Sequence, residues 1–286
     1  MSTPLHSRFQ DGRLHLQHGP IDCIVEAWGP AEEIEAAYGQ ATTRFADLLQ
    51  GLVSELEVLR APVTGAWPLV RGPVAKRMVA AAWPHRSMFI TPMAAVAGAV
   101  ADELLEAMLR GRKLEKAYVN DGGDIALHLS GNAMFDVGIA ADPDVPYPAG
   151  GLQVRAADPV RGIATSGWKG RSQSLGIADA VTVLAADAAA ADAAATMIAN
   201  AVNVEHPSIR RRPACEVKED SDLGILPVTV EVGDLPLAAV EAALDAGEQA
   251  ALALRATGLV AGAFLSLKGR VRVVQHRPAS AMTARC

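Results

Sequence analysis

The chain has 286 residues, half of them apolar and a fifth charged, so it can bury a large core and does not have the composition of a disordered protein. Lysine and arginine number 26 against 32 aspartate and glutamate residues, and the resulting net charge of −6 argues against a basic surface made for a phosphate backbone. We therefore expect no nucleic-acid partner.

The most apolar stretches lie at residues 93–100 and 181–202, and acidic residues end or interrupt both. Since a spanning helix needs roughly 18 uninterrupted apolar residues, we expect the chain not to cross a membrane. The first residues lack the charged and apolar regions of a signal peptide. Three widely separated cysteines without a CxxC spacing indicate neither a zinc site nor a disulfide framework. Together these features predict a cytoplasmic protein.

The first third of the chain predicts strands followed by helices. Partial alternation over residues 8–28, with Asp-Gly and Gly-Pro turns, is typical of a β-meander. Residues 31–52 have an acidic first turn and an apolar stripe, which predicts one long amphipathic helix packed on the sheet. A loop rich in proline and glycine over 62–73 precedes a short helix at 74–83. A Thr-Pro pair is then expected to begin a helix of small residues over 91–110.

The rest of the chain predicts short strands, an alanine-rich helix, one further helix and a closing hairpin. Strands are expected at 116–119, 125–129, 134–140, near 154 and 163, at 181–184 and 228–232, and in a hairpin of 260–267 and 271–275. Helices are expected at 187–203 and 237–255. Residues 142–151 are interpreted as an ordinary surface loop rather than a lid, and the arginines at 210–212 as part of a solvated loop. This order predicts an α+β fold with mixed or antiparallel sheets, in a single domain of residues 1–286.

A paired-glycine turn at the end of an apolar strand is the first candidate binding segment. Gly122 and Gly123 allow the backbone to turn sharply and to bring N–H groups close to a phosphate or a ring edge. Asn120 and Asp124 add polar side chains at the same place. The alternative is a plain hairpin turn in which these side chains satisfy local backbone groups.

The second candidate segment is a compact run of hydrogen-bonding groups. Thr165, Ser166 and the N–H of Gly167 are followed by Lys169, a set suited to phosphate oxygens. Trp168 could stack on an aromatic ligand or fill space in the core. The segment on its own leaves both roles of the tryptophan open.

The alanine-rich helix carries a carboxylate and a hydroxyl on one face. Asp192 and Thr196 are four residues apart, so in a helix both project together and could share an oxygen-liganded cation such as Mg²⁺. The alternative is a core helix in which Asp187 favours the N-terminal dipole and Thr196 bonds to its own backbone.

A histidine in the loop before the small-residue helix is the candidate proton carrier. His85 and Arg86 lie just ahead of the Thr-Pro pair, where an imidazole could move a proton and a guanidinium could hold an anion. A histidine that only forms hydrogen bonds at the surface is the alternative.

These segments, in this order, resemble the ApbE-like superfamily of FAD:protein FMN transferases. The motifs that carry the resemblance are ITPMAAVAG at 90–98, VNDGGD at 119–124, IATSG at 163–167 and ADAAAT at 191–196. SLGIAD at 174–179 is similar to the smaller, uncharacterised, non-secreted branch. The resemblance implies an α+β fold that binds FAD or FMN, with Mg²⁺ held by Asp192, Thr196 and the backbone carbonyl of Ala94. It also implies transfer of FMN to a threonine of a protein acceptor.

The chain departs from the family pattern in three places. The segment 170–179 lacks the histidine of the HxIDPxTG-type motif, Ala97 stands where the family has a lysine, and typical members are exported lipoproteins. Our leading hypothesis is a Mg²⁺-dependent, flavin- or nucleotide-binding transferase that moves a nucleotidyl or phosphoryl group, with His85 as a substitute base. The second hypothesis is a non-catalytic flavin- or pterin-binding accessory protein in one-carbon metabolism. A homo-oligomer is left open.

Overall fold

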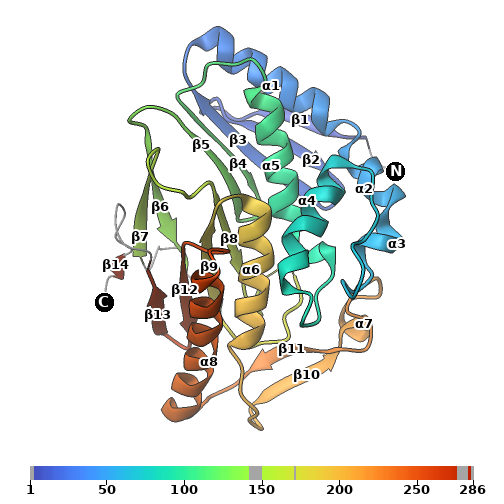
Figure 1. The fold of residues 1–286 in the computed structure, drawn as a ribbon, viewed down its shortest axis with the longest axis vertical. Helices are drawn as coiled ribbons and strands as arrows, with labels where there is room; N and C mark the ends of the chain where they lie inside the picture. Colours follow the sequence, from blue (N-terminus) through green and yellow to red (C-terminus); the bar gives the residue numbers. More distant parts are fainter. Residues whose placement is uncertain (1–2, 142–149, 171, 276–282, 285–286) are drawn as a thin grey trace. The chain divides into compact units, whose positions relative to one another are not determined.

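The computed structural model describes residues 3–141, 150–170, 172–275 and 283–284. These residues belong to two compact units, each made of several separated segments of the chain. The first unit comprises Met1–Phe135, Arg155–Ala164 and Ala185–Ala193, and the second comprises Asp136–Val154, Thr165–Leu184 and Ala194–Cys286. Figure 1 labels the helices and strands of both units.

The first unit is built on an antiparallel sheet whose strands follow one another in chain order. Its strands are β1 (Leu5–Arg8), β2 (Leu14–His18), β3 (Ile21–Trp28), β4 (Lys116–Asp121) and β5 (Asp124–Leu129). Gly12 and Gly19 have φ values of 89° and 58° in the turns of the meander, a conformation that glycine adopts without a steric penalty. The predicted β-meander is therefore confirmed.

Two helices cover one face of this sheet. Successive residues of β2, β3 and β4 alternate between buried and more exposed positions, as expected for strands with one face in the core. The helices are α1 (Ala31–Phe45) and α5 (Val96–Leu109). They pack on each other, and α5 packs on β4 and β5, as Figure 1 shows. The core of the first unit lies between them and the sheet.

The predicted helix over 31–52 was wrong in its continuity. The chain forms α1, breaks at Asp47 and continues as α2 (Leu48–Ser54) and α3 (Leu56–Leu59). Asp47 has a non-helical φ of −110°, and its carboxylate accepts a hydrogen bond from the guanidinium of Arg44 at 2.8 Å. The apolar stripe continues across the break, so periodicity alone gave no sign of it.

The other helices of the first unit agree with their predicted positions, with one difference in type. The short helix is α4 (Pro73–Ala82), which runs into a 3-10 turn, η1 (Trp83–His85). The predicted small-residue helix begins as a second 3-10 turn, η2 (Pro92–Ala95), before α5. Thr91 precedes it in extended conformation and gives no side-chain cap, which is a correction to the predicted N-cap.

The second unit contains two helices and further antiparallel strand pairs. Its elements include β7 (Gly150–Arg155), β10 (Ile209–Pro213), α7 (Ala214–Val217), β11 (Pro227–Val232), α8 (Leu237–Ala256), β12 (Gly262–Leu267), β13 (Arg270–Val274) and β14 (Thr283–Ala284). The predicted closing hairpin is β12 and β13, on which α8 packs, and β12 also pairs with β9 (Ala180–Ala185). The boundary between the units falls inside β6 (Met134–Ile139), β7, β8 (Gly162–Ser166), β9 and α6 (Ala188–Ala201).

The arginines at 210–212 form a strand rather than the predicted solvated loop. They lie on β10, which pairs with β11 in antiparallel register. Each arginine has an acidic partner: Arg210 with Glu231, Arg211 with Glu205 and Arg212 with Glu216, at N–O distances of 3.1, 3.6 and 3.4 Å. These ion pairs allow adjacent arginines to occupy a strand, where their like charges would otherwise repel.

The helices and antiparallel sheets confirm the predicted α+β class. The single domain stays a prediction. The predicted surface loop at 142–151 lies, but for its last two residues, outside the described part of the chain. Across the described residues, every helix is too short or too polar to span a membrane.

Candidate functional site

The paired glycines form a tight hairpin turn between β4 and β5. Asp121 and Asp124 are opposite each other in the strand register, and Gly122 and Gly123 complete the turn with φ values of 65° and 113°. The side-chain oxygen of Asn120 accepts a hydrogen bond from the N–H of Gly123 at 2.8 Å. The side chain of Asn120 therefore satisfies a backbone group of the turn, as in the plain hairpin that the sequence left open as an alternative.

Asp192 on α6 is the carboxylate around which three segments of the first unit meet. Its Oδ2 accepts a hydrogen bond from the N–H of Gly98 on α5 at 3.1 Å. Burial raises the pKa of Asp192 well above its usual range, and the negative charges of Asp124 and Asp121 raise it further. The side chain keeps partial contact with solvent, so water screens part of this effect. The carboxylate on α6 is therefore hydrogen-bonded to the first turn of α5 and repelled by the two acids of the β4–β5 turn.

Two glycines allow the start of α6 to come into contact with its neighbours. A Cβ atom on Gly98 would lie 2.2 Å from the carbonyl oxygen of Ala188, and one on Gly162 would lie 1.9 Å from that of Asp187. No real Cβ atom approaches an oxygen so closely. The backbone of 187–188 therefore lies against both glycines, and only glycine fits at either position.

Asp102 is a residue of this region that the sequence reasoning missed. Its two oxygens accept the N–H groups of Ala188 and Ala189 at 3.0 and 2.9 Å, while Asp187 caps Ala190 at 2.7 Å. Burial raises the pKa of Asp102 to about 6, and the charge of Asp187 adds to the shift. The available signal was an acid one turn after Gly98, in a helix whose preceding residues are all small or apolar.

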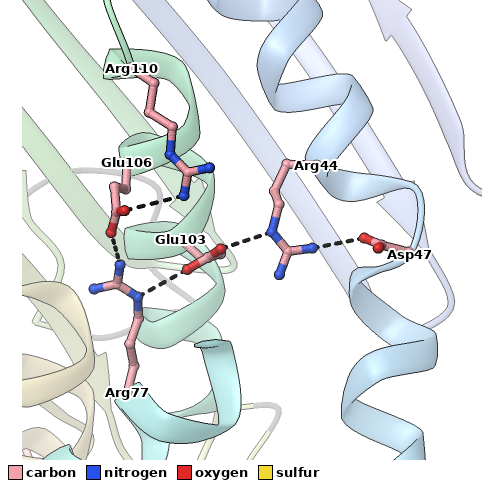
Figure 2. Close-up of polar contacts among 6 residues, drawn as sticks. All are labelled: Arg44, Asp47, Arg77, Glu103, Glu106 and Arg110. Atoms are coloured by element: carbon pink, nitrogen blue, oxygen red, sulfur yellow. Dashed lines mark hydrogen bonds and ion pairs between the residues drawn. The ribbon is translucent and has the colours of Figure 1, made fainter. Parts of the chain in front are cut away.

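An ion-pair network fixes the opposite face of α5. Glu103 is buried and accepts hydrogen bonds from the Nε atoms of Arg44 at 2.8 Å and Arg77 at 3.3 Å. Figure 2 shows that the network continues from Arg77 through Glu106 to Arg110. Because Arg44 belongs to α1 and Arg77 to α4, the network holds the helix that presents Gly98 to Asp192.

The predicted metal ligands are distributed over α6 and η2. Asp192 and Thr196 both lie on α6, four residues apart, as predicted. Ala94 lies in η2, where its N–H donates to the carbonyl of Thr91 at 3.1 Å. In the described part of the chain, no group of three or more His, Cys, Asp or Glu side chains gathers as a metal site would require. The predicted set contains only one carboxylate and stays a prediction.

The Thr-Ser-Gly segment belongs to the second unit, at the end of β8. Thr165 is exposed, and its hydroxyl forms a hydrogen bond of 2.9 Å with the hydroxyl of Thr182. Ser166 is partly exposed, and Gly167 is buried. The contacts of these three residues with a ligand stay predictions.

His85 lies in η1 of the first unit and is buried. Burial lowers the pKa of its imidazole, which favours the neutral ring. Among the residues that the structure describes, the ring forms no hydrogen bond or ion pair. Arg86 lies with its guanidinium 4.4 Å from the ring centroid of Trp83 and donates to the carbonyl of Trp83 at 2.9 Å. The alternative of a surface histidine is therefore wrong, and the role of His85 as a base stays a prediction.

Comparison with solved structures gives matches that include a flavinyl transferase, aligned over almost the whole chain. The apo form of the flavinyl transferase ApbE from Pseudomonas stutzeri is matched with a TM-score of 0.46 and 12% sequence identity. The match covers 99% of this chain and 95% of that chain.

Comparison with known sequences gives several archaeal relatives. A UPF0280 protein of Methanothermobacter thermautotrophicus is 38% identical over 144 residues, which is 49% of this chain and 54% of the relative. A UPF0280 protein of Methanosarcina acetivorans is 41% identical over 133 residues, or 46% and 49% of the two chains. The chain thus matches about half the length of these curated relatives.

A protein-family model described as "AbpE bacteria" matches residues 6–273. The match includes every motif on which the resemblance to the ApbE-like superfamily was based, from 90–98 to 191–196. The chain therefore belongs to the AbpE bacteria family, within the ApbE-like superfamily.

Proposed function

We propose that this protein binds a flavin nucleotide together with Mg²⁺ and transfers a nucleotidyl or phosphoryl group from it to an acceptor. The observation that carries the proposal is the environment of Asp192, a carboxylate held by the N–H of Gly98 among the charges of Asp124 and Asp121. Membership of the AbpE bacteria family and the name of the solved ApbE flavinyl transferase agree with the flavin assignment.

The three predicted ligands have the chemistry that Mg²⁺ requires. Carboxylate, hydroxyl and carbonyl oxygens are hard ligands, and Asp192, Thr196 and the carbonyl of Ala94 would supply one of each. A cation would also offset the repulsion that raises the pKa of Asp192. When bound, Mg²⁺ neutralises phosphate charge and orients the transferred group.

The paired-glycine turn is the proposed contact for the ligand in the first unit. Gly122 and Gly123 leave no side chain between the turn and a ligand, and Asp124 follows them directly. Asn120 keeps the shape of the turn through its bond to Gly123. In the second unit, Thr165, Ser166 and Gly167 are the proposed phosphate contacts.

His85 is the proposed proton acceptor for the attacking hydroxyl of the acceptor. Its burial keeps the imidazole neutral near pH 7, which is the form that takes up a proton. The proton moves from the hydroxyl to the ring as the oxygen bonds to phosphorus, and the leaving phosphate takes the former bonding electrons. His85→Gln should lower turnover by about a hundredfold or more without changing flavin affinity.

A specific observation favours a second, non-catalytic function. The segment 170–179 contains no histidine, and Ala97 occupies the position of the family lysine. A protein that had lost these groups could keep the flavin or a pterin as an accessory protein in one-carbon metabolism. The transferase and the accessory protein would both bind the flavin, but only the transferase would catalyse a reaction.

Binding and turnover are measured separately. Fluorescence titration of FMN and FAD, with and without Mg²⁺, compares the wild type with Asp192→Asn. The control is Asp47→Asn, which changes an exposed carboxylate at the break between α1 and α2. Incubation with FAD, Mg²⁺ and candidate acceptors then releases AMP only if the protein is a transferase. Absence of flavin binding in the wild type would end the proposal, and binding without AMP release would leave the accessory function.

A further inference from the structure

A partly exposed tryptophan in the second unit is anchored at two points. Trp168 directly follows the Thr-Ser-Gly segment, and its indole Nε1 donates a hydrogen bond to Oδ1 of Asp179 at 3.2 Å. Its backbone N–H donates to the carbonyl of Ala178 at 3.0 Å. The indole is thus held along one edge while part of its surface remains in solvent.

The carboxylate that holds the indole is buried and is itself hydrogen-bonded to a second segment of the chain. Asp179 is buried, and its Oδ2 accepts the N–H of Lys268 at 2.6 Å. The N–H of Asp179 donates to the carbonyl of Ser266 at 2.9 Å. Lys268 is in the β12–β13 turn with a φ of 48°, which is unusual for a residue with a side chain. The charge of Asp179 therefore joins the tryptophan to the closing hairpin of the second unit.

The backbone before the tryptophan is also fixed. A Cβ atom on Gly167 would lie 2.4 Å from the carbonyl oxygen of Asp179 and 3.0 Å from that of Ala178. The chain at Gly167 therefore lies in contact with the backbone that carries the anchoring carboxylate. Movement of the backbone that carries the indole would have to break these contacts together.

This arrangement distinguishes the two roles that the sequence left open for Trp168. Trp168 is partly exposed although its N–H is satisfied inside the protein, which leaves part of the residue accessible to a ligand. The Nζ atom of Lys169 lies over the ring, 6.0 Å from its centroid, and Ser166 is partly exposed. A fixed aromatic surface next to a cation and a hydroxyl matches a flat heterocycle that carries a phosphate.

We propose that Trp168, positioned by Asp179, stacks on the aromatic ring of the phosphate-bearing ligand. The inference rests on the proposed flavin function and names its ring-binding residue. Asp179 acts through the indole and is a positioning residue, not a catalytic one.

The test compares two substitutions of the tryptophan with FMN as the probe. Trp168→Leu keeps an apolar side chain without an aromatic ring, and Trp168→Phe keeps a smaller ring. We expect the FMN Kd to rise about tenfold or more for the leucine variant and clearly less for the phenylalanine variant, because base–aromatic stacking has that strength. Quenching of bound FMN by the indole should be lost in both. Trp67→Leu, at an exposed position of the first unit, should change neither quantity.

Substitution of Asp179 tests the positioning role. Asp179→Asn retains an oxygen that accepts the indole N–H, whereas Asp179→Ala does not. We expect the FMN Kd to remain within about threefold of the wild type for the asparagine variant and to rise about tenfold for alanine. A residue with a purely structural role would lower the stability of both variants without this separation.

The outcomes separate this inference from the function on which it rests. A wild type that binds neither FMN nor FAD overturns both. A wild type that binds FMN with an affinity unchanged in Trp168→Leu overturns the stacking role alone. Equal FMN affinities for Asp179→Ala and the wild type overturn the role of Asp179. Should Trp168→Leu fail to fold, loss of FMN quenching in Trp168→Phe supports the stacking role, and unchanged quenching overturns it.

Discussion

The proposed function needs Asp192 in its ionised form, but its surroundings disfavour that form. The carboxylate receives one hydrogen bond from Gly98, but burial and two neighbouring acids raise its pKa. In the absence of a cation, this residue therefore lowers the stability of the folded protein. A bound divalent cation would reverse the sign of that contribution.

Asp192→Asn tests this reversal through the free energy of unfolding at pH 7. Without metal, the variant should be at least as stable as the wild type, because the amide oxygen still accepts the N–H of Gly98 and the repulsion is gone. With Mg²⁺ at about 100 times its Kd, the wild type should gain about 2.7 kcal/mol and the variant far less. Equal gains in urea titrations of both proteins would contradict Asp192 as a ligand.

Gly98 provides a steric prediction at the same scale. Gly98→Ala places a methyl group 2.2 Å from the carbonyl oxygen of Ala188, so α5 and α6 must separate, and we expect a loss of about 1–3 kcal/mol or more. Gly39→Ala is the matched control on α1, since its Cβ atom meets nothing within 4 Å. That variant should gain up to about 1 kcal/mol from helix propensity. Chemical denaturation that shows the same sign for both would refute the close approach.

Among the elements, α5 links the sheet to the start of α6. Its first turn presents the N–H of Gly98, its second turn caps α6 through Asp102, and its other face is held by the Glu103 network. The position of the candidate site therefore depends on how firmly this helix is held.

Asp102 predicts a pH dependence of stability. Its folded-state pKa of about 6 lies above the usual value of 3.8, so the folded state takes up the proton first, and the resulting stabilisation is lost as pH rises through about 6. The contribution of Asp102 to the free energy of unfolding is at most about 3 kcal/mol, and screening by solvent reduces it. Between pH 4 and 7, Asp102→Asn should remove this contribution to the pH dependence of stability. The substitution can also change stability by an amount that does not depend on pH. Parallel stability curves for the two proteins would contradict the shift.

Glu103 predicts a large loss of stability when its charge is removed. Glu103→Ala removes the buried partner of Arg44 and Arg77, which then keep only their exposed partners Asp47 and Glu106, and we expect a loss of about 1–3 kcal/mol. Glu106→Ala on the exposed side of the same helix should cost about 1 kcal/mol or less. If urea unfolding shows similar losses in the free energy of unfolding for Glu103→Ala and Glu106→Ala, burial of Glu103 does not strengthen the network.

For the whole molecule, we predict one cooperative unfolding transition. The boundary between the two compact units falls inside strands and inside α6, so neither unit can lose its structure without breaking elements of the other. Calorimetric and van't Hoff enthalpies should therefore agree, as they do for a single domain. Two resolved transitions in scanning calorimetry would contradict the single domain predicted for residues 1–286.

Local patterns were sufficient for most elements of the molecule. Alternation and turn residues predicted the meander of β2 and β3, and apolar periodicity predicted α6 and α8 within a few residues. The strand at 210–212 was missed because Arg210 is paired with the distant Glu231. The break at Asp47 was missed because the apolar periodicity continues across it, although its charged partner Arg44 is only three residues away.

By itself, the sequence determined the α+β class, the family motifs and the pairing of Asp192 with Thr196 on one helix, because each depends on residues within a few positions of one another. Only the tertiary structure decided that Gly98, Asp124 and Asp192 act on one another, that Asp102 caps a helix more than eighty residues away, and that Asp179 anchors Trp168. Those contacts join segments far apart in the chain. Their energies depend on burial and distance, which no local pattern encodes.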